Sequence, residues 1–257
     1  MELRILGARQ GESRNSHFAS LLVDGILALD AGGLTSTLTL EEQAAIRAVL
    51  LTHHHFDHIK DLGTLGFNSF ERGQLHICCT EVAREAIGET VTSDRIWIDF
   101  FTRPAPEKPT FLYSRVEPGQ PFTVEGYRVN PIPVKHTIPA VGYELTAPAG
   151  GTILYTGDNG PGSAEAWASC TPDVLITETT YPNALAQLAG EHGHLAPTLL
   201  TEELRCYRRL RGFLPKVLIV HINPFFEGTI RSELDAVASE VGADITVAEE
   251  GTTITVS

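Results

Sequence analysis

The stretch Thr-His-His-His-Phe-Asp-His, residues 52–58, places four potential metal ligands within six positions. The imidazoles of His53 and His55 are spaced to converge on one cation. The side chains of Asp57 and His58 then turn toward a second cation. Imidazole nitrogen and carboxylate oxygen are ligands that zinc and similar divalent ions prefer in proteins. We therefore predict a metal site at residues 53–58.

The alternative interpretation of this stretch is a histidine-rich surface loop that binds nothing. The histidines, however, directly follow the apolar run Ala48–Leu51, so they lie where a buried strand emerges and not in a low-complexity tail. In an extended chain, neighbouring side chains point to opposite sides, and His54 then faces away from the other histidines. We leave His54 out of the ligand set.

Chain length and composition favour a globular fold. A chain of 257 residues buries about three-quarters of the surface that its unfolded form exposes. Its residues are 42% hydrophobic and 20% charged, which is ordinary for a globular protein. No Gly/Ser linker or short internal repeat divides the sequence. We expect a single domain over residues 1–257.

The charge balance limits the partners that we expect. The chain has 32 acidic and 19 basic residues and a net charge of −13. Such a surface repels phosphate backbones, so extended nucleic acid is not an expected partner. A small anionic substrate remains compatible with this charge, because bound cations would dominate the local field.

Cysteine usage and the N-terminus indicate the compartment. Cys78, Cys79, Cys170 and Cys206 form no Cys-x-x-Cys pair, so we interpret them as buried thiols of a reducing compartment. Residues 1–7 lack the apolar core of a secretory signal and resemble a first strand. No apolar run reaches the ~18 residues of a spanning helix. We expect a cytoplasmic protein with no membrane partner.

Apolar runs and turn residues predict the secondary structure. Strands are predicted at 2–6, 18–30, 48–51, 74–78, 122–124, 127–134, 141–146, 152–155, 174–177, 217–220 and, last, 245–247. Helices are predicted at 39–47, 80–87, 197–210 and 230–241, with a loop or short helix at 59–66. Residues 93–113 mix five aromatic residues with three prolines. We interpret that segment as core packing, with a lid or substrate-binding flap as the alternative.

Several apolar runs end in a side chain of a ligand type. The runs are 48–51 before His53, 153–155 before Asp158, 175–177 before Glu178 and 218–220 before His221. His136 follows the strand predicted at 127–134. Strands covered by helices on both faces are continuous apolar runs, and functional groups gather at their ends. The pattern therefore favours an α/β protein with a site assembled from several loops.

The order of these residues resembles the metallo-β-lactamase superfamily. The resemblance rests on His-x-His-x-Asp-His at 53–58, His136, Thr-Gly-Asp at 156–158 and His221, and it covers nearly the whole chain. It implies an αββα four-layer sandwich, in which two mixed sheets pack face to face with helices outside. It also allows a homodimer.

The same resemblance implies a dinuclear centre with two divalent metal ions, zinc being expected and manganese or iron being alternatives. One ion would be held by His53, His55 and His136, the second by Asp57, His58 and His221, and Asp158 would bridge them. Two such ions lower the pKa of a bridging water, so a hydrolase that attacks with a metal-bridging hydroxide is expected. Asp30 is a candidate to orient a ligand histidine, with a turn-capping role as the alternative.

A second part of the sequence indicates the substrate. Glu178 and the segment Gly-His-Leu-Ala-Pro at 193–197 resemble the acid and histidine of class II cyclic-nucleotide phosphodiesterases and RNase Z-like enzymes. Ala196 departs from the Thr or Ser expected there. The resemblance implies that His194, held by Glu178, acts as a general acid, while Asp57 orients the attacking hydroxide. His192 is the competing candidate for the catalytic histidine.

The sequence therefore predicts a phosphodiesterase for a small cyclic nucleotide of the 3′,5′-cAMP or cGMP type. An RNase Z-like tRNA 3′ endonuclease is the nearest alternative, but the net charge and the lack of a long Gly-rich or basic arm disfavour it. Only residues 205–211 concentrate basic charge, and a solvated helix face is the other interpretation of them. A thioester or lactone hydrolase would use the same hydroxide. A true β-lactamase is disfavoured because we find no export signal. A metal-stabilised binding module is the alternative outside enzymes.

Overall fold

The computed structural model describes residues 1–70 and 72–257, which form two seven-stranded mixed sheets and a two-stranded ribbon. The first sheet has the order β16-β1-β2-β3-β4-β5-β8. Its strands are β1 (Glu2–Gly7), β2 (Ser20–Val23), β3 (Leu27–Leu29), β4 (Ala48–Leu50), β5 (Leu75–Cys79), β8 (Phe111–Arg115) and β16 (Thr253–Thr255). Strands β3, β4, β5 and β8 run parallel, whereas the other neighbours are antiparallel.

The second sheet has the order β15-β14-β13-β12-β11-β10-β9. Its strands are β9 (Phe122–Val124), β10 (Tyr127–Val134), β11 (Ala140–Thr146), β12 (Thr152–Tyr155), β13 (Val174–Glu178), β14 (Lys216–Val220) and β15 (Ile245–Val247). Strands β12 to β15 are parallel, and β9 to β12 are antiparallel. The ribbon pairs β6 (Pro104–Ala105) with β7 (Lys108–Pro109).

The two sheets pack face to face because alternate side chains of each strand point to opposite faces. In β3, Leu27 and Leu29 belong to the core between the sheets, where Tyr143 of β11 and Val220 of β14 also lie. Ala28, between the two leucines, faces the other way and joins the core under the helices. Strands buried on both faces therefore appear as continuous apolar runs in the sequence.

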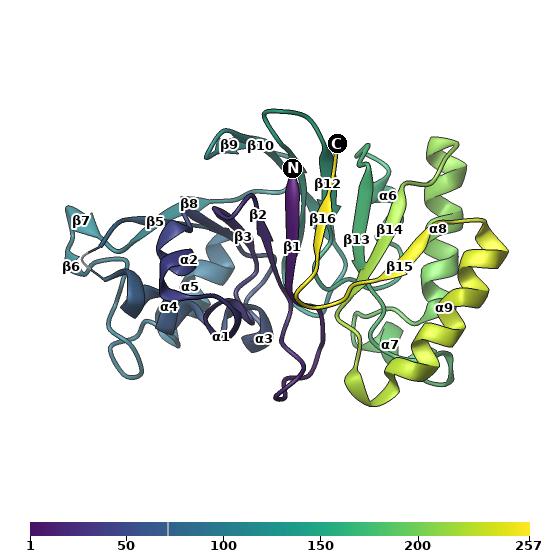
Figure 1. The fold of residues 1–257 in the computed structure, drawn as a ribbon, viewed down its shortest axis with the longest axis horizontal. Coiled ribbons are helices and arrows are strands. Elements are labelled where there is room, and N and C mark those ends of the chain that lie inside the picture. The colour runs from purple at the N-terminus through teal and green to yellow at the C-terminus, as the bar shows by residue number, and fades with distance from the viewer. Residues whose placement is uncertain (71) are drawn as a thin grey trace.

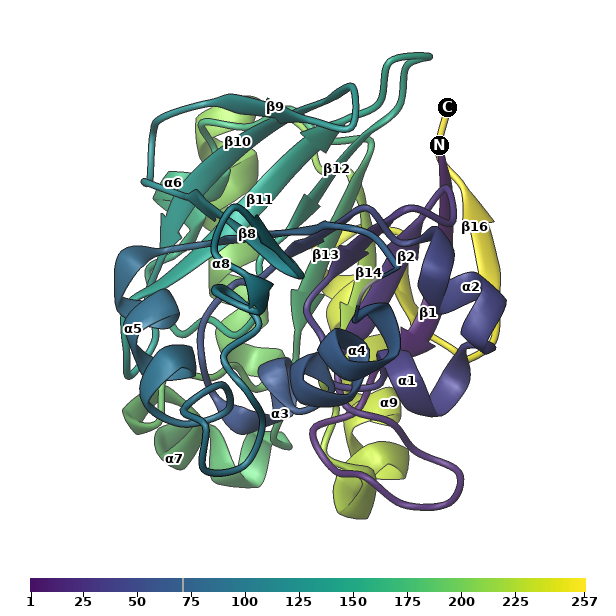
Figure 2. The ribbon, with the colours of Figure 1, turned by 90° about the vertical axis from the view of Figure 1, so that its left-hand side faces the viewer.

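Helices cover the outer face of each sheet and complete four layers (Figure 1). On the first sheet lie α1 (Leu34–Thr37), α2 (Leu40–Ala45), α3 (Phe56–Ile59), α4 (Leu62–Ser69) and α5 (Glu81–Glu89), which face the viewer in Figure 2. On the second lie α6 (Ala164–Trp167), α7 (Ala186–Glu191), α8 (Pro197–Arg211) and α9 (Glu227–Val241). The short helices η1 (Asn183–Leu185) and η2 (Pro224–Phe226) directly precede α7 and α9. Both termini meet where β1 pairs with β16.

The predicted helices are confirmed, with small shifts at their ends. Thr39 and Glu42 form a reciprocal capping box at the start of α2, and Thr80 accepts a hydrogen bond from the backbone of α5. Helix α8 begins at Pro197 and ends before Gly212, which has the left-handed conformation with φ of 82°.

Two strand predictions are wrong. Residues 18–30 are not one strand, because Asp24 and Gly25 take positive φ angles of 47° and 73° and fold the segment into the β2–β3 hairpin. Residues 245–247 are not the last strand, because β16 returns to pair with β1 in the other sheet. Strand β8 and helices α6 and α7 were not predicted, since each is short or lacks a clear period.

Four of the five aromatic residues at 93–113 pack in or against the core, as the first interpretation of them predicted, whereas Tyr113 is 38% exposed. Phe100 and Phe111 are fully buried between the first sheet and its helices, and Trp97 and Phe101 pack against the same cluster. The ring of Trp97 occupies the space where a side chain on Gly63 would lie. The segment therefore packs against α4 through its aromatic side chains.

Candidate metal centre

Five strands bring ligand-type side chains into one cluster. The clustered side chains follow β4 (His53, His55, Asp57 and His58), β10 (His136), β12 (Asp158), β13 (Glu178, its last residue) and β14 (His221). Their ligand atoms form overlapping groups in which all members lie within 4.8 Å of one another. The seven predicted metal ligands and Glu178 are thus brought together from residues distant in sequence.

Two backbone conformations hold this cluster in place. Gly157 has a φ of +60°, and a Cβ there would lie 2.7 Å from side-chain atoms of Thr52, so the turn before Asp158 requires glycine. His221 has a φ of +56°, which is unusual for a residue with a side chain. The N–H of the next residue, Ile222, donates a hydrogen bond to the carbonyl of Ala8, and this bond helps to hold the unusual backbone conformation.

The first ligand group consists of His53, His55 and His136. Nδ1 of His55 lies 3.1 Å from Nε2 of His53 and 3.1 Å from Nε2 of His136. Two nitrogens bound to one tetrahedral zinc ion at about 2.0–2.1 Å lie about 3.3 Å apart. The spacing of these three ring nitrogens therefore fits a shared ion.

The second ligand group consists of Asp57, His58 and His221. Oδ2 of Asp57 lies 3.1 Å from Nε2 of His221 and 3.7 Å from Nε2 of His58. The buried Nε2 of His58 has no hydrogen-bond partner among the described residues. A buried polar atom without a partner carries a desolvation cost, which a bound cation would remove.

Asp158 lies between the two groups with one oxygen toward each. Its Oδ1 is 3.2 Å from Nε2 of His58 and 3.4 Å from Nε2 of His221. Its Oδ2 is 3.7 Å from Nε2 of His53 and 3.9 Å from Nε2 of His136. The arrangement fits a carboxylate that bridges two ions.

The other ring nitrogen of four histidines is held by a neighbour, as in known metal sites. Nδ1 of His53 contacts the hydroxyl of Thr52, Nδ1 of His58 contacts Asp30, Nδ1 of His136 contacts the carbonyl of Gly193, and Nδ1 of His221 contacts the hydroxyl of Thr180. Each contact leaves Nε2 directed into the cluster.

Asp30 is buried and has the orienting role that the sequence suggested for it. Its Oδ2 lies 2.8 Å from Nδ1 of His58, and it accepts hydrogen bonds from Tyr155 at 2.7 Å and from the backbone of Thr52 at 2.8 Å. Asp30 therefore holds His58 directly. It also holds His53 through the hydroxyl of Thr52.

Burial and charge set the protonation states that metal binding requires. Burial lowers the pKa of His53, His55 and His136, which favours neutral imidazoles. Burial raises the pKa of Asp57, but the neighbouring His58 and His221 outweigh it and lower that pKa to about 2.

The three carboxylates of the cluster also fit a cation site. Asp30, Asp57 and Asp158 converge there, and among the described residues no lysine or arginine forms an ion pair with them. Burial opposes the charging of His58, but the surrounding carboxylates, Asp158 first, raise its pKa well above the usual range. The residues present therefore fit two divalent ions, which would neutralise the carboxylates.

Glu178 and His194 form a pair beside the second ligand group. Nδ1 of His194 lies 2.7 Å from Oε1 of the fully buried Glu178. The ring of His194 stacks on that of His221 at 5.5 Å and meets that of His136 edge-on at 5.2 Å. Burial lowers the pKa of His194, but Glu178 outweighs it and the pKa rises to about 9.

The neighbours of this pair explain two features of the sequence. His192, the competing candidate, is exposed at the end of α7, outside the cluster. Ala196 precedes α8 without a capping side chain, and Oδ1 of Asn183 accepts the hydrogen bond from the N–H of Thr198 instead. Although Ala196 lacks the hydroxyl of the expected Thr or Ser, Asn183 from another loop therefore caps the start of α8.

Thr52, Thr180 and Tyr155 are the residues of this site that sequence reasoning missed. Thr52 precedes the first histidine, and Thr180 comes two residues after Glu178, so proximity to ligands was the only available signal. Tyr155 ends an apolar run and was predicted only as part of a strand. Its hydroxyl reaches Asp30 only because the two sheets face each other.

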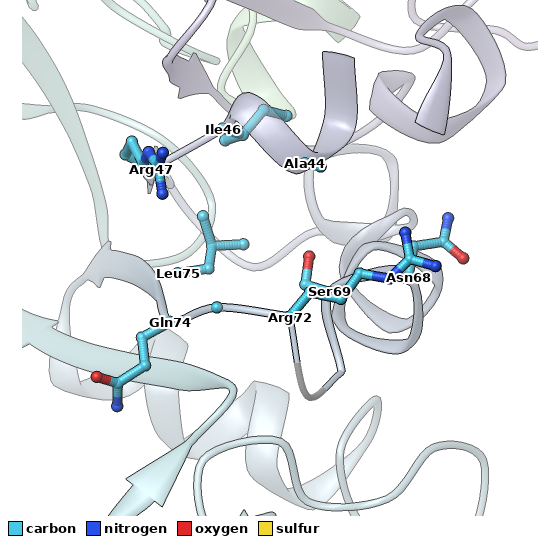
Figure 3. A pocket seen from close by; sticks show the side chains of 9 residues that line it. Ala44, Ile46, Arg47, Asn68, Ser69, Arg72, Gln74 and Leu75 are labelled. Carbon is cyan, nitrogen blue, oxygen red and sulfur yellow. The ribbon is translucent and has the colours of Figure 1, made fainter. Parts of the chain in front are cut away.

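Two pockets differ in their relation to the cluster. A pocket of about 90 Å³ between α2, α4 and β5 is lined by Ala44, Ile46, Arg47, Asn68, Ser69, Arg72, Gly73, Gln74 and Leu75 (Figure 3). None of these residues belongs to the cluster, and we assign the pocket no role. A second, of about 240 Å³, borders His136 and is lined also by Lys135, Thr137, Gly160, Pro161, Gly190, Glu191 and Gly193. His136 is the one cluster residue among those that line this pocket.

A family model described as a β-lactamase superfamily domain matches residues 21–222. The chain belongs to the metallo-β-lactamase superfamily. Members of this superfamily are metal-dependent hydrolases, and the two mixed sheets with outer helices are its α/β fold. The resemblance inferred from the histidine motif and the predicted sandwich are therefore confirmed.

Solved structures with the superfamily fold cover almost the whole chain. Unliganded yeast PDE1 matches with a TM-score of 0.79 at 19% identity over 98% of both chains. YhfI from Bacillus subtilis matches with a TM-score of 0.78 at 20% identity over 99% of both chains. The short form of human tRNase Z matches with a TM-score of 0.71 at 18% identity over 100% of both chains. At these identities the likeness shows the fold.

One curated relative matches part of the superfamily domain. An octanoyltransferase of Porphyromonas gingivalis (strain ATCC BAA-308 / W83) is 31% identical over 102 residues, which are 39% of this chain and 20% of that protein.

Among the described residues, no helix has the length and apolar character needed to cross a membrane.

Proposed function

We propose that the protein is a phosphodiesterase that uses two divalent metal ions, zinc being expected, to hydrolyse a small cyclic nucleotide of the 3′,5′-cAMP or cGMP type. His53, His55 and His136 would hold one ion, Asp57, His58 and His221 the other, and Asp158 would bridge them. When bound, two such ions lower the pKa of a water molecule and neutralise charge on the phosphate. We propose Asp57, His194 and Glu178 as the catalytic residues.

The observation that carries the proposal is the position of His194 over the second ligand group. Its Nδ1 is engaged by Glu178, which leaves Nε2 for a substrate. The side chain is 12% exposed, whereas Glu178 behind it is fully buried. A histidine held in this way beside a cation site is suited to donate a proton to a leaving oxygen.

The proposed step exchanges one bond at phosphorus and moves two protons. The oxygen of water forms a bond to phosphorus, while Asp57 accepts a hydrogen bond from that water and orients it, and one proton of the water is released to solvent. The bond between phosphorus and the ribose 3′ oxygen breaks. Nε2–H of His194 gives its proton to that leaving oxygen, and Glu178 keeps the ring in place. The product is a nucleoside 5′-monophosphate.

Surface charge favours a small substrate over tRNA. Of the four arginines of α8, Arg205 pairs with Glu202 and Glu240, and Arg208 donates to the uncharged carbonyl of Val241. The net charge of −13 disfavours binding of an RNA backbone. We propose a cytoplasmic location, which the cysteine usage led us to expect.

The proposal is tested with purified protein supplied with zinc or manganese. The substrates are 3′,5′-cAMP, 3′,5′-cGMP, bis(p-nitrophenyl) phosphate, a tRNA precursor, a thioester and a lactone. We expect hydrolysis of the cyclic nucleotides and of the nitrophenyl diester. Turnover of the tRNA precursor would support an endonuclease instead, and turnover of the carbonyl substrates alone would contradict the phosphodiesterase assignment.

A further inference from the structure

We infer that Thr180 is a positioning residue of the metal centre, which fixes His221 as a ligand of the second ion and joins that ligand to Glu178 and His194. The inference rests on the dinuclear site proposed above. It concerns a side chain that lies outside the ligand groups and that touches neither ion nor substrate. Its basis is the hydrogen bonding of one buried hydroxyl.

The hydroxyl of Thr180 lies between a carboxylate and an imidazole. Oγ1 donates to Oε2 of Glu178 and lies 2.9 Å from Nδ1 of His221. A hydroxyl has one proton, and an ionised carboxylate only accepts, so Oγ1 accepts from Nδ1–H of His221. The carbonyl of His221 is a second acceptor at 3.1 Å, but it is more distant and uncharged. The lone pair of His221 is then on Nε2, which faces the second ligand group.

The remaining contacts of Glu178 fix the direction of this hydrogen bond. Oε1 accepts from the backbone N–H of Asn159 at 3.0 Å and from Nδ1 of His194 at 2.7 Å. Oε2 accepts from Thr180 and from the backbone N–H of Leu195 at 3.2 Å. Four hydrogen bonds are thus directed at the two carboxylate oxygens, so Glu178 accepts from Thr180. One carboxylate thus holds both the proposed acid and, through Thr180, a ligand.

Thr52 has the same arrangement in the first ligand group. Its hydroxyl lies 3.0 Å from Nδ1 of His53 and donates to Oδ2 of Asp30 at 2.9 Å. Both threonines are buried, with exposures of 1% for Thr52 and 0% for Thr180. The chain therefore contains two carboxylate–threonine–histidine relays, one for each proposed ion, and each serves as the control for the other.

Removal of the hydroxyl of one of these threonines should weaken the binding of one ion only. Valine has the shape of threonine but neither donates nor accepts a hydrogen bond. Loss of an outer partner of a ligand histidine costs about 10–100-fold in metal affinity. We expect Thr180→Val to lower the affinity for the second ion by about that factor and to leave the first unchanged. Thr52→Val should do the reverse, and Thr180→Ser should restore binding.

Metal binding is measured without substrate. Metal-depleted wild type, Thr180→Val, Thr180→Ser and Thr52→Val are titrated with zinc by calorimetry. Cadmium NMR resolves the two ions, with His53→Ala and His58→Ala assigning the resonances. Circular dichroism checks that each variant is folded. Because no activity is required, absence of cyclic-nucleotide hydrolysis would overturn the proposed function and leave this inference intact.

The outcomes distinguish a Thr180 that positions a metal ligand from a Thr180 that only stabilises the fold. Selective loss of the second ion in Thr180→Val, with rescue by serine, supports the inference. Wild-type affinity for both ions in Thr180→Val overturns it. Equal weakening of both ions also overturns it, as does failure of Thr180→Ser to bind the second ion in a folded protein.

Discussion

Nδ1 of His194 lies 2.7 Å from Oε1 of Glu178, and this contact places the imidazole over the second ligand group with its other nitrogen available. Residue 178 ends β13, whereas residue 194 lies in the loop before α8. The pair therefore depends on the packing of that loop against the end of the sheet.

His194→Ala should remove the proton donor but keep the metal ligands. We expect kcat for cyclic nucleotides to fall about 10²–10⁴-fold, which is the usual contribution of a general acid. Hydrolysis of bis(p-nitrophenyl) phosphate should fall far less, because nitrophenolate is a weak base and leaves without a proton. Steady-state kinetics on both substrates measures the difference. His192→Ala, an exposed histidine two positions away, is the control and should retain wild-type rates; equal losses on both substrates would contradict the acid role.

Asp158→Ala should impair binding of both ions, because one oxygen of this carboxylate faces each ligand group. We expect the zinc content of the purified variant, measured by mass spectrometry, to fall from two ions to fewer than one. Chelation of wild type should lower its Tm, since a ligand that binds only the folded state stabilises it. Asp173→Asn alters an exposed carboxylate that accepts from Thr152 and should keep both ions. Two ions in Asp158→Ala would refute the bridging role.

Gly157→Ala should destabilise the fold beyond the cost of its backbone angle. A positive φ costs roughly 1–2 kcal/mol for a residue with a side chain. At Gly157 the new Cβ would also meet Thr52 at 2.7 Å, whereas Gly119, with a φ of +75°, has no atom within 4 Å of that position. Urea unfolding of both alanine variants separates the two effects. A free energy of unfolding that falls equally in both would show that the contact with Thr52 has no cost.

Thiol labelling should distinguish Cys206 from the other three cysteines. Burial raises the pKa of Cys78, Cys79 and Cys170 to about 12 from a usual 9.0. A raised pKa means less thiolate. At pH 8 the reactive thiolate fraction of these three cysteines is about 1,000-fold smaller than that of a thiol with the usual pKa. We expect one thiol to react with Ellman's reagent in the native protein and four in urea. Fast reaction of more than one native thiol would contradict this burial.

Much of the site could be predicted because its chemistry is concentrated in short motifs. Residues 53–58 alone imply metal binding, and apolar runs that end in Asp158 and His221 imply strand ends. The hairpin at residues 24–25 and the pairing of β1 with β16 could not be predicted. Local propensity does not distinguish a turn within an apolar run from a continuous strand, nor does it specify which strand a terminal segment joins.

The sequence by itself determined the ligand types, their order and, through the capping residues, most of the helices. Only the tertiary structure decided which atoms meet. Asp158 faces both ligand groups, Thr180 joins His221 to Glu178, and Tyr155 reaches Asp30 across the sandwich. The physical reason is that a hydrogen bond or a coordination site depends on distances of about 3 Å, which the packing of two sheets determines and which sequence spacing does not contain.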